Sequence, residues 1–287
     1  MPPGIKITTI CENSVFFPVR GVLGEHGLSM LLEIRGKRIL FDTGAGLTLL
    51  PNARTLNIDL TRIDAVVLSH GHYDHCGGLK DLLQLTGPVP VYAHPAIFQD
   101  KYDIRKGKEP RQIGLPWTRE YLEDLGAHFF LGRTPREIIE GVILTGEIPR
   151  VESQEKEKSD ELYLCYKKPD GSFAEDPLDD DQAIIIESSA GTIVLLGCAH
   201  AGLINTLRYA SDLTGKSQIY AFFGGTHLVN ASIERLNYTV NALNPFQLQK
   251  LAPCHCTGLK ANFSLFQAYK ESFLPNFAGT VFSESEI

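Results

Sequence analysis

Short apolar runs and helical repeats alternate along this chain. The runs are rich in Val, Ile, Leu and Phe, which is typical of strands in a buried sheet. They lie at residues 5–10, 28–34, 37–41, 65–68, 90–93, 183–187, 192–196, 219–223, 250–254 and 277–282. Leucines and other apolar residues at helical spacing predict helices within residues 47–56, from residue 79 onward, and at 203–213, 231–243 and 259–269.

The order of these elements indicates the fold class. Strand clusters open each half of the chain, and strand–loop–helix units follow in each half. This order predicts an α/β protein in which two similar halves pack as layers, with sheets inside and helices outside. We predict a single domain over residues 1–287, with insertions near residues 100–117 and 151–160, where the periodicity is lost. The first insertion is either a lid over the site or a solvated surface loop.

Composition narrows the classes of function. The 287 residues carry a formal net charge of −7, without a Lys/Arg cluster, which argues against a nucleic-acid partner. No apolar run has membrane-spanning length, and the first residues lack the order of a signal peptide, so we expect a cytoplasmic protein without a membrane partner. The 6 cysteines are irregularly spaced, and we expect reduced thiols. Whether the chain forms a homo-oligomer stays open.

Four metal-ligand side chains follow the predicted strand at residues 65–68. They are His70, His72, Asp74 and His75. Imidazole and carboxylate are the usual donors for zinc and other first-row divalent ions. His70 and His72 can point to one side of an extended loop while Asp74 and His75 point to another, so one loop can serve two ions. Four donors in this order argue against the alternative that these histidines only make local hydrogen bonds.

The His-x-His-x-Asp-His order after a strand resembles the metallo-β-lactamase superfamily. Residues 28–32, followed by the FDTG sequence at residues 41–44, look like the opening hairpin and turn of that superfamily. The resemblance spans nearly the whole chain. It implies an αββα sandwich with one or two divalent metal ions at one edge of the sheets, zinc first and manganese or iron as alternatives.

Five further segments are similar to one subgroup of the superfamily, the archaeal dihydropterin–(ribofuranosyl)aminobenzene-phosphate synthases, whose members are also called metal-dependent hydrolases. The segments are residues 25–29 (EHGLS), 145–150 (TGEIPR), 197–202 (GCAHAG), 224–228 (GGTHL) and 254–258 (CHCTG). The resemblance implies an enzyme that acts on a phosphorylated or heterocyclic small molecule. It implies condensation of the synthase type, or hydrolysis of a phosphoester, lactone or thioester by metal-activated hydroxide. A non-catalytic metal-binding or sensing protein is the alternative from another class.

The rest of the metal site is less regular. The superfamily places a Gly-Asp near residue 198, but this chain has Gly197-Cys198. His200 is our candidate to replace that carboxylate, with Cys198 as the alternative ligand and otherwise a core thiol close to the site. His255 matches the last histidine of the superfamily pattern. If its segment is extended, Cys254 and Cys256 point away from His255 and serve only in packing.

Several other residues are candidates for the site. Asp74 and His200 are the candidate catalytic residues as well as ligands. His227, His26 and Arg150 are candidates for contact with substrate. Asp42 in the FDTG turn is expected to brace the metal loop by hydrogen bonds, the usual role of residues behind the ligands. The superfamily's third histidine, expected between His75 and residue 198, has no clear counterpart, and Glu147 is expected near the site as its substitute.

Overall fold

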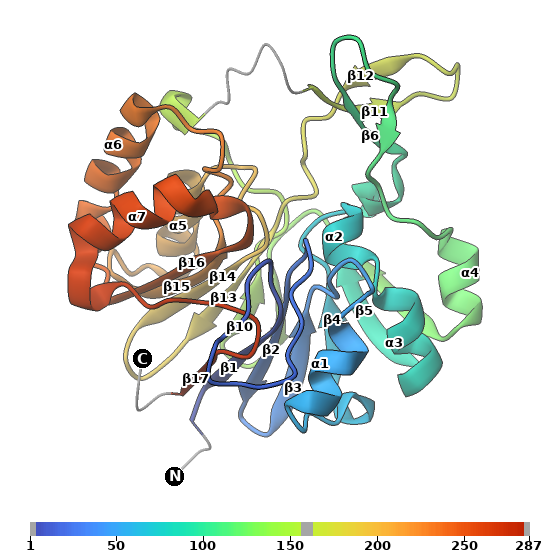
Figure 1. The fold of residues 1–287 in the computed structure, drawn as a ribbon, viewed down its shortest axis with the longest axis horizontal. Helices are drawn as coiled ribbons and strands as arrows, with labels where there is room; N and C mark the ends of the chain where they lie inside the picture. Colours follow the sequence, from blue (N-terminus) through green and yellow to red (C-terminus); the bar gives the residue numbers. More distant parts are fainter. Residues whose placement is uncertain (1–3, 156–162, 284–287) are drawn as a thin grey trace.

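Two large sheets form the centre of the molecule (Figure 1). The computed structural model describes residues 4–155 and 163–283. The first sheet has seven strands in the order β17-β1-β2-β3-β4-β5-β8. Their bounds are β1 Lys6–Cys11, β2 Ser29–Ile34, β3 Lys37–Phe41, β4 Ala65–Val67, β5 Val89–Ala93, β8 Ala127–Leu131 and β17 Val281–Ser283.

The second sheet has six strands in the order β16-β15-β14-β13-β10-β9. Their bounds are β9 Arg136–Ile139, β10 Val142–Leu144, β13 Ala183–Glu187, β14 Thr192–Leu196, β15 Ile219–Gly225 and β16 Lys250–Cys254. In both sheets antiparallel hairpins lead into parallel strands, with β3-β4-β5 parallel in one and β14-β15-β16 parallel in the other. The ends of these parallel strands lie at one edge of the sandwich, where α/β folds place their sites.

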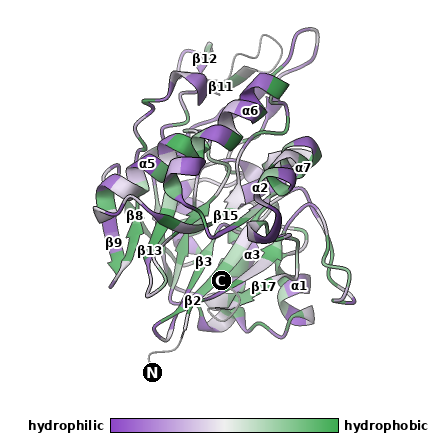
Figure 2. Ribbon diagram, turned by 90° about the vertical axis from the view of Figure 1, so that its left-hand side faces the viewer, coloured by the Kyte–Doolittle hydropathy of each residue, from purple (hydrophilic) through white to green (hydrophobic). Residues whose placement is uncertain are grey.

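The apolar runs arise because both faces of each sheet are covered. Within β13, Ile184 and Ile186 pack between the two sheets, whereas Ile185 packs against the helices outside. In β2, Leu32 faces the inner core and Leu31 faces the outer one. Figure 2 shows the strands in the apolar colour through the centre of the molecule. Four layers result, helix–sheet–sheet–helix.

The helices divide between the two outer faces (Figure 1). On the first sheet lie α1 (Leu49–Thr55) and α3 (Leu79–Thr86), which pack through a cluster that includes Leu49, Leu79 and Leu82. On the second sheet lie α5 (Leu203–Thr214), α6 (Ile233–Ala242) and α7 (Gly258–Tyr269). Two shorter helices are α2 (Tyr73–Cys76) and α4 (Arg119–Asp124). None of the helices within the described residues is both long and apolar enough for a membrane crossing.

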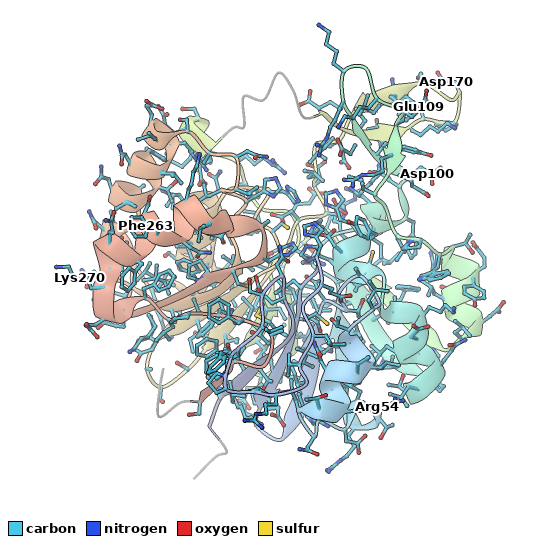
Figure 3. All side chains as sticks on the ribbon, in the orientation of Figure 1. Arg54, Asp100, Glu109, Asp170, Phe263 and Lys270 are labelled. Atoms are coloured by element: carbon cyan, nitrogen blue, oxygen red, sulfur yellow. The ribbon has the colours of Figure 1, made fainter. Side chains whose placement is uncertain are left out.

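A separate four-stranded sheet, which we call the arm, stands out from the sandwich beside α2 (Figure 1). It consists of β6 (Lys101–Ile104), β7 (Arg111–Gln112), β11 (Tyr163–Lys167) and β12 (Phe173–Glu175). Figure 3 labels Asp100, Glu109 and Asp170 on this part of the chain. The first insertion therefore contains the paired strands β6 and β7 as well as an exposed loop between them. Of the second insertion, residues 156–160 lie outside the described part of the chain.

The αββα sandwich expected from the sequence is confirmed. The strands predicted at residues 37–41, 183–187, 192–196 and 250–254 have the bounds of β3, β13, β14 and β16. The last predicted strand, at residues 277–282, is shorter and later, because a turn at residues 277–280 precedes β17.

Candidate metal centre

The metal loop leaves β4 at the edge of the first sheet and enters α2 at Tyr73. Its residues Ser69 and His70 are completely buried. Gly71 lies against Ile97, and a Cβ atom placed on Gly71 would come within 2.6 Å of the Ile97 carbonyl oxygen. Only glycine allows this approach, so the packing of the loop requires the residue that separates the first two histidines.

The carboxylate of Asp42 fixes the metal loop through hydrogen bonds to Ser69 and His75. Its backbone has φ +61°, a left-handed conformation that is costly for a residue with a side chain. The conformation directs its carboxylate to the loop, where one oxygen accepts the Ser69 N–H at 2.7 Å. The other oxygen lies 2.7 Å from both the Ser69 hydroxyl and Nδ1 of His75. With Nδ1 of His75 engaged in this way, Nε2 is the nitrogen that remains for a ligand.

A first group of three imidazoles lies above the loop, formed by His70, His72 and His200. One ring nitrogen from each lies within 4.8 Å of the others. Nε2 of His70 and Nδ1 of His72 are 3.0 Å apart. Within the described residues, the buried Nε2 atoms of His72 and His200 have no hydrogen-bond partner. Buried nitrogens are normally paired, and three clustered imidazoles with two unpaired nitrogens among them suit a metal ion.

A second group forms beside it from Asp74, His255 and His26, whose ligand atoms also lie within 4.8 Å of one another. Nε2 of His255 is 3.4 Å from the Asp74 carboxylate and 3.1 Å from Nε2 of His75. His26 contributes from the surface: its Nε2 is 3.3 Å from the same carboxylate, and 61% of its side chain is exposed. His26 therefore lies at the mouth of the centre.

Cys198 lies between the two groups. Its sulfur is 3.2 Å from Nε2 of His75, and it belongs to three sets of potential ligands, those with His70 and His75, with His200 and His227, and with His255 and Cys256. The expectation that this sulfur points into the core is wrong. Cys198 is buried, but β14 ends at Leu196, and the sulfur faces the histidines at the position where the superfamily pattern has a carboxylate.

Cys256 also lies elsewhere than its sequence position predicts. We expected both cysteines beside His255 to point away from it, because side chains alternate along an extended strand. The strand β16 ends at Cys254, and His255 begins a 3-10 helix, His255–Thr257, with φ +53°. The change of conformation brings the Cys256 sulfur within 4.8 Å of Cys198 and His255. Cys254 packs in the core near Asn276, as expected.

The charge state of the first group favours metal binding. Burial lowers the pKa of His70 and His200 well below the ordinary value, and it lowers the pKa of His72 to about 4. Neighbouring cationic groups lower the values for His70 and His200 further. Neutral imidazole keeps the lone pair that a metal ion requires. The donor set, its burial and its unpaired nitrogens therefore fit a divalent metal ion.

His75 has the opposite shift. Burial alone would lower its pKa, but the carboxylates of Asp42 and Asp74 raise it to about 9. Burial raises the pKa of Asp74, yet the adjacent His75 and the His255 ring lower it well below the ordinary value. A metal ion at the second group would thus take the place of a proton on His75 and find an ionised carboxylate beside it.

Two residues expected near the site have other contacts. Arg150 donates hydrogen bonds from its guanidinium to the carbonyl oxygens of His200, Pro177 and Leu178, at 3.0, 2.6 and 3.0 Å. These contacts support the backbone at His200, and contact of Arg150 with substrate stays a prediction. Glu147 pairs with Nε2 of His94 at 3.0 Å and with Arg133, and it is in none of the ligand groups that the described residues form. His200 completes the first group in its place.

His227 lies beside the first group, with its ring 4.2 Å from the ring of His200. It has φ +49°, and Ala199 and His255 are also left-handed at φ +54° and +53°. Together with Asp42, these residues bring four left-handed non-glycine residues to the centre. Left-handed non-glycine residues cost conformational energy, and the surrounding packing must offset that cost. Residues strained in this way cluster at functional sites.

Comparison with known proteins agrees with this geometry. Residues 23–159 match the family described as the metallo-beta-lactamase superfamily. The chain is 34% identical to the 7,8-dihydropterin-6-methyl-4-(beta-D-ribofuranosyl)-aminobenzene-5'-phosphate synthase of Methanocaldococcus jannaschii, over 96% of each chain. The chain belongs to the metallo-beta-lactamase superfamily.

Two further relatives match at full length. An uncharacterized protein of the same organism is 37% identical, over 91% of this chain and 94% of that one. The crystal structure of Tm1679, described as a metal-dependent hydrolase of the beta-lactamase superfamily, is 27% identical with a TM-score of 0.80, and the match covers 97% of this chain and 98% of that one. The superfamily and the similarity to the synthase, both expected from the sequence motifs, are confirmed.

Proposed function

We propose that this member of the superfamily binds two divalent metal ions and acts on a phosphorylated or heterocyclic small molecule, as its similarity to the synthase suggests. The observation that carries the proposal is the convergence of His70, His72 and His200 at one edge of the sheets, with two buried nitrogens unpaired among the described residues. The chain matches an enzyme over 96% of its length, and it has this group of potential metal ligands. Together these two observations favour catalysis over a sensing role.

The residues divide between the two ions. His70, His72 and His200 would hold one ion. Asp74 and His255 of the second group would hold the other together with His75, whose Nε2 lies 3.8 Å from the Asp74 carboxylate and 3.1 Å from Nε2 of His255. Cys198 lies between the two sets. Zinc is the ion that we propose first, because imidazole and thiol donors suit it, with iron or manganese as alternatives. A bound ion would supply positive charge against a departing phosphate or lower the pKa of a water molecule.

The remaining residues would position and shield the substrate. The chain directly after β7 of the arm borders the metal loop, since the Ile113 carbonyl accepts the Tyr73 N–H at 2.8 Å and Gly114 forms a bridge with His72. His26, at the mouth, is placed to contact a substrate that reaches Asp74. Burial lowers the pKa of the His26 imidazole, so the neutral ring could accept a proton from the substrate. His227 remains a candidate substrate contact beside His200.

Two assays distinguish condensation from hydrolysis. Metal-loaded protein would be incubated with a dihydropterin that carries a leaving group on its 6-methyl carbon, together with ribofuranosylaminobenzene 5'-phosphate, and the joined product would be sought by mass spectrometry. In parallel, phosphoesters, lactones and thioesters would be tested for hydrolysis, the activity class that the description of Tm1679 favours. A metal-loaded protein that is inert in both assays would contradict the proposal. The cytoplasmic location and the oligomeric state remain predictions from sequence.

A further inference from the structure

The backbone makes room for the Cys256 sulfur beside the candidate metal centre. A Cβ atom on Gly225 would lie 2.5 Å from the Gly197 carbonyl oxygen and 2.6 Å from this sulfur, both closer than real Cβ atoms approach. Only glycine at the end of β15 leaves this space. The left-handed His255 then turns the chain so that residue 256 faces inward. Gly225 and His255, which lie in separate segments of the chain, together allow the Cys256 thiol to lie beside the candidate metal centre.

The surroundings of this thiol differ from those of a packing cysteine. Its sulfur accepts the His227 N–H at 3.2 Å and lies near the Cys198 sulfur and a ring nitrogen of His255, all buried. An N–H directed at sulfur stabilises a thiolate in metal sites. The neighbouring Cys254 instead packs among apolar side chains, with the Asn276 amide 3.5 Å from its sulfur.

We propose that Cys256 is a thiolate ligand of the metal centre, acting with Cys198 and His255. The inference rests on the metal centre of the proposed function. On binding, each thiol releases its proton to solvent, and a sulfur lone pair forms the bond to the ion. Two thiolates favour zinc or ferrous iron over manganese or magnesium, because soft sulfur ligands suit the former ions. The thiolates would replace the single carboxylate of the superfamily pattern and change the metal preference of the site.

Cobalt(II) substitution tests this assignment without an enzyme assay, because sulfur–cobalt bonds give charge-transfer absorption in the near ultraviolet. The full chain, stripped of metal and reconstituted with cobalt, should show this absorption. X-ray absorption of the zinc form should show sulfur at about 2.3 Å. We expect Cys256→Ser and Cys198→Ser each to lose part of the cobalt band, and the double variant to lose all of it. Cys254→Ser, two positions away, is the matched control and should keep the full band.

Four outcomes would contradict the assignment or its basis. If Cys256→Ser binds cobalt with the spectrum of the unmodified protein, Cys256 is not a ligand. If Cys256→Ser fails to fold, Cys198→Ser answers the same question, because Cys256 is then the one cysteine left in the ligand groups of the described residues. Loss of the whole sulfur signal in Cys198→Ser overturns the inference. If the unmodified protein takes up no ion at all, the proposed function fails together with this assignment. If the unmodified protein binds an ion through nitrogen and oxygen ligands only, the thiolate assignment is wrong, whereas the proposed metal centre is not contradicted.

Discussion

The Asp180 carboxylate accepts the backbone N–H of Gly71 at 2.7 Å, between the first two histidines of the metal loop. Its second oxygen accepts a hydrogen bond from Nζ of Lys101 at 2.9 Å, and the same ammonium donates to Asp176 at 2.7 Å. These side chains are almost completely buried. Since Lys101 belongs to β6, this ionic group ties the arm to the metal loop.

Replacing Lys101 should destabilise the protein severely. In Lys101→Met, two buried carboxylates lose their only ammonium partner among the described residues, and an uncompensated buried charge costs about 3–5 kcal/mol. The free energy of unfolding from urea titration measures the loss. Lys6→Met is the control, because the Lys6–Glu33 pair is half exposed and such pairs contribute at most about 1 kcal/mol. Equal losses in the two variants would show that the buried group has no special role.

The metal loop could be predicted from sequence because its information is local. His70, His72, Asp74 and His75 follow one strand within six residues, so any fold that forms β4 brings them together. The contact of His200 with His70 depends on pairing between distant segments. His200 was proposed as a ligand because it lies beside Gly197-Cys198, where the superfamily pattern has a Gly-Asp. Its distance from His70 along the sequence gave no indication of that contact.

The errors have physical causes that a single sequence does not display. Alternation along a strand misplaced Cys256, because the strand ends one residue before His255 and the backbone becomes left-handed there. The arm was missed because β6 pairs with β11, which lies about sixty residues later, and neither strand has a clear apolar pattern. Glu147 was expected near the metal on the basis of its motif, but an arginine and a histidine beside it satisfy its charge.

Removing one imidazole from the first group should abolish tight metal binding. In His72→Ala the centre loses a buried ligand nitrogen that no neighbouring side chain replaces. Substitution of residues that only hold the ligands in place lowers metal affinity by up to about 100-fold. We therefore expect the loss of a ligand to lower the affinity for the metal by more than about 100-fold. Metal content after dialysis against a weak chelator is the measurement. The exposed His128 on β8 gives the control variant, His128→Ala. Full metal occupancy in His72→Ala would contradict the ligand assignment.

Asp74→Asn should keep the fold and lose most activity. The amide has the same shape, but it lacks the charge that would bind an ion, and it cannot accept a proton. We expect turnover of any identified substrate to fall at least about 100-fold, as for loss of a group that transfers protons. Circular dichroism would verify the fold. Asp81→Asn on the surface of α3 should remain active. Near-native turnover of Asp74→Asn would make Asp74 only a structural brace.

Asp181 should make the protein less stable as pH rises. One oxygen of its carboxylate accepts the Ala201 N–H at 2.8 Å, whereas the other has no partner among the described residues. Burial raises the pKa of Asp181 to about 6, from an ordinary value of 3.8 for aspartate. Below about pH 4 the carboxyl is neutral in both folded and unfolded chains and costs nothing. Between about pH 4 and 6 the unfolded chain releases its proton first, so folding loses stability, and above about pH 6 the cost is constant.

Asp181→Asn removes this titration and should therefore be the more stable protein at neutral pH. At about 1.4 kcal/mol per pKa unit, the shift corresponds to a gain on the order of 3 kcal/mol above about pH 6, which disappears near pH 4. Urea unfolding of the metal-free protein across this range, with and without the substitution, measures the difference. Asp212→Asn on the exposed face of α5 should show no such trend. If the difference between Asp181→Asn and the unmodified protein does not change with pH, Asp181 is ionised in the folded chain at all these values. Its second oxygen would then need a cation or water molecule beside the His200 segment, and the acidic residue would contribute to the charge of the metal centre.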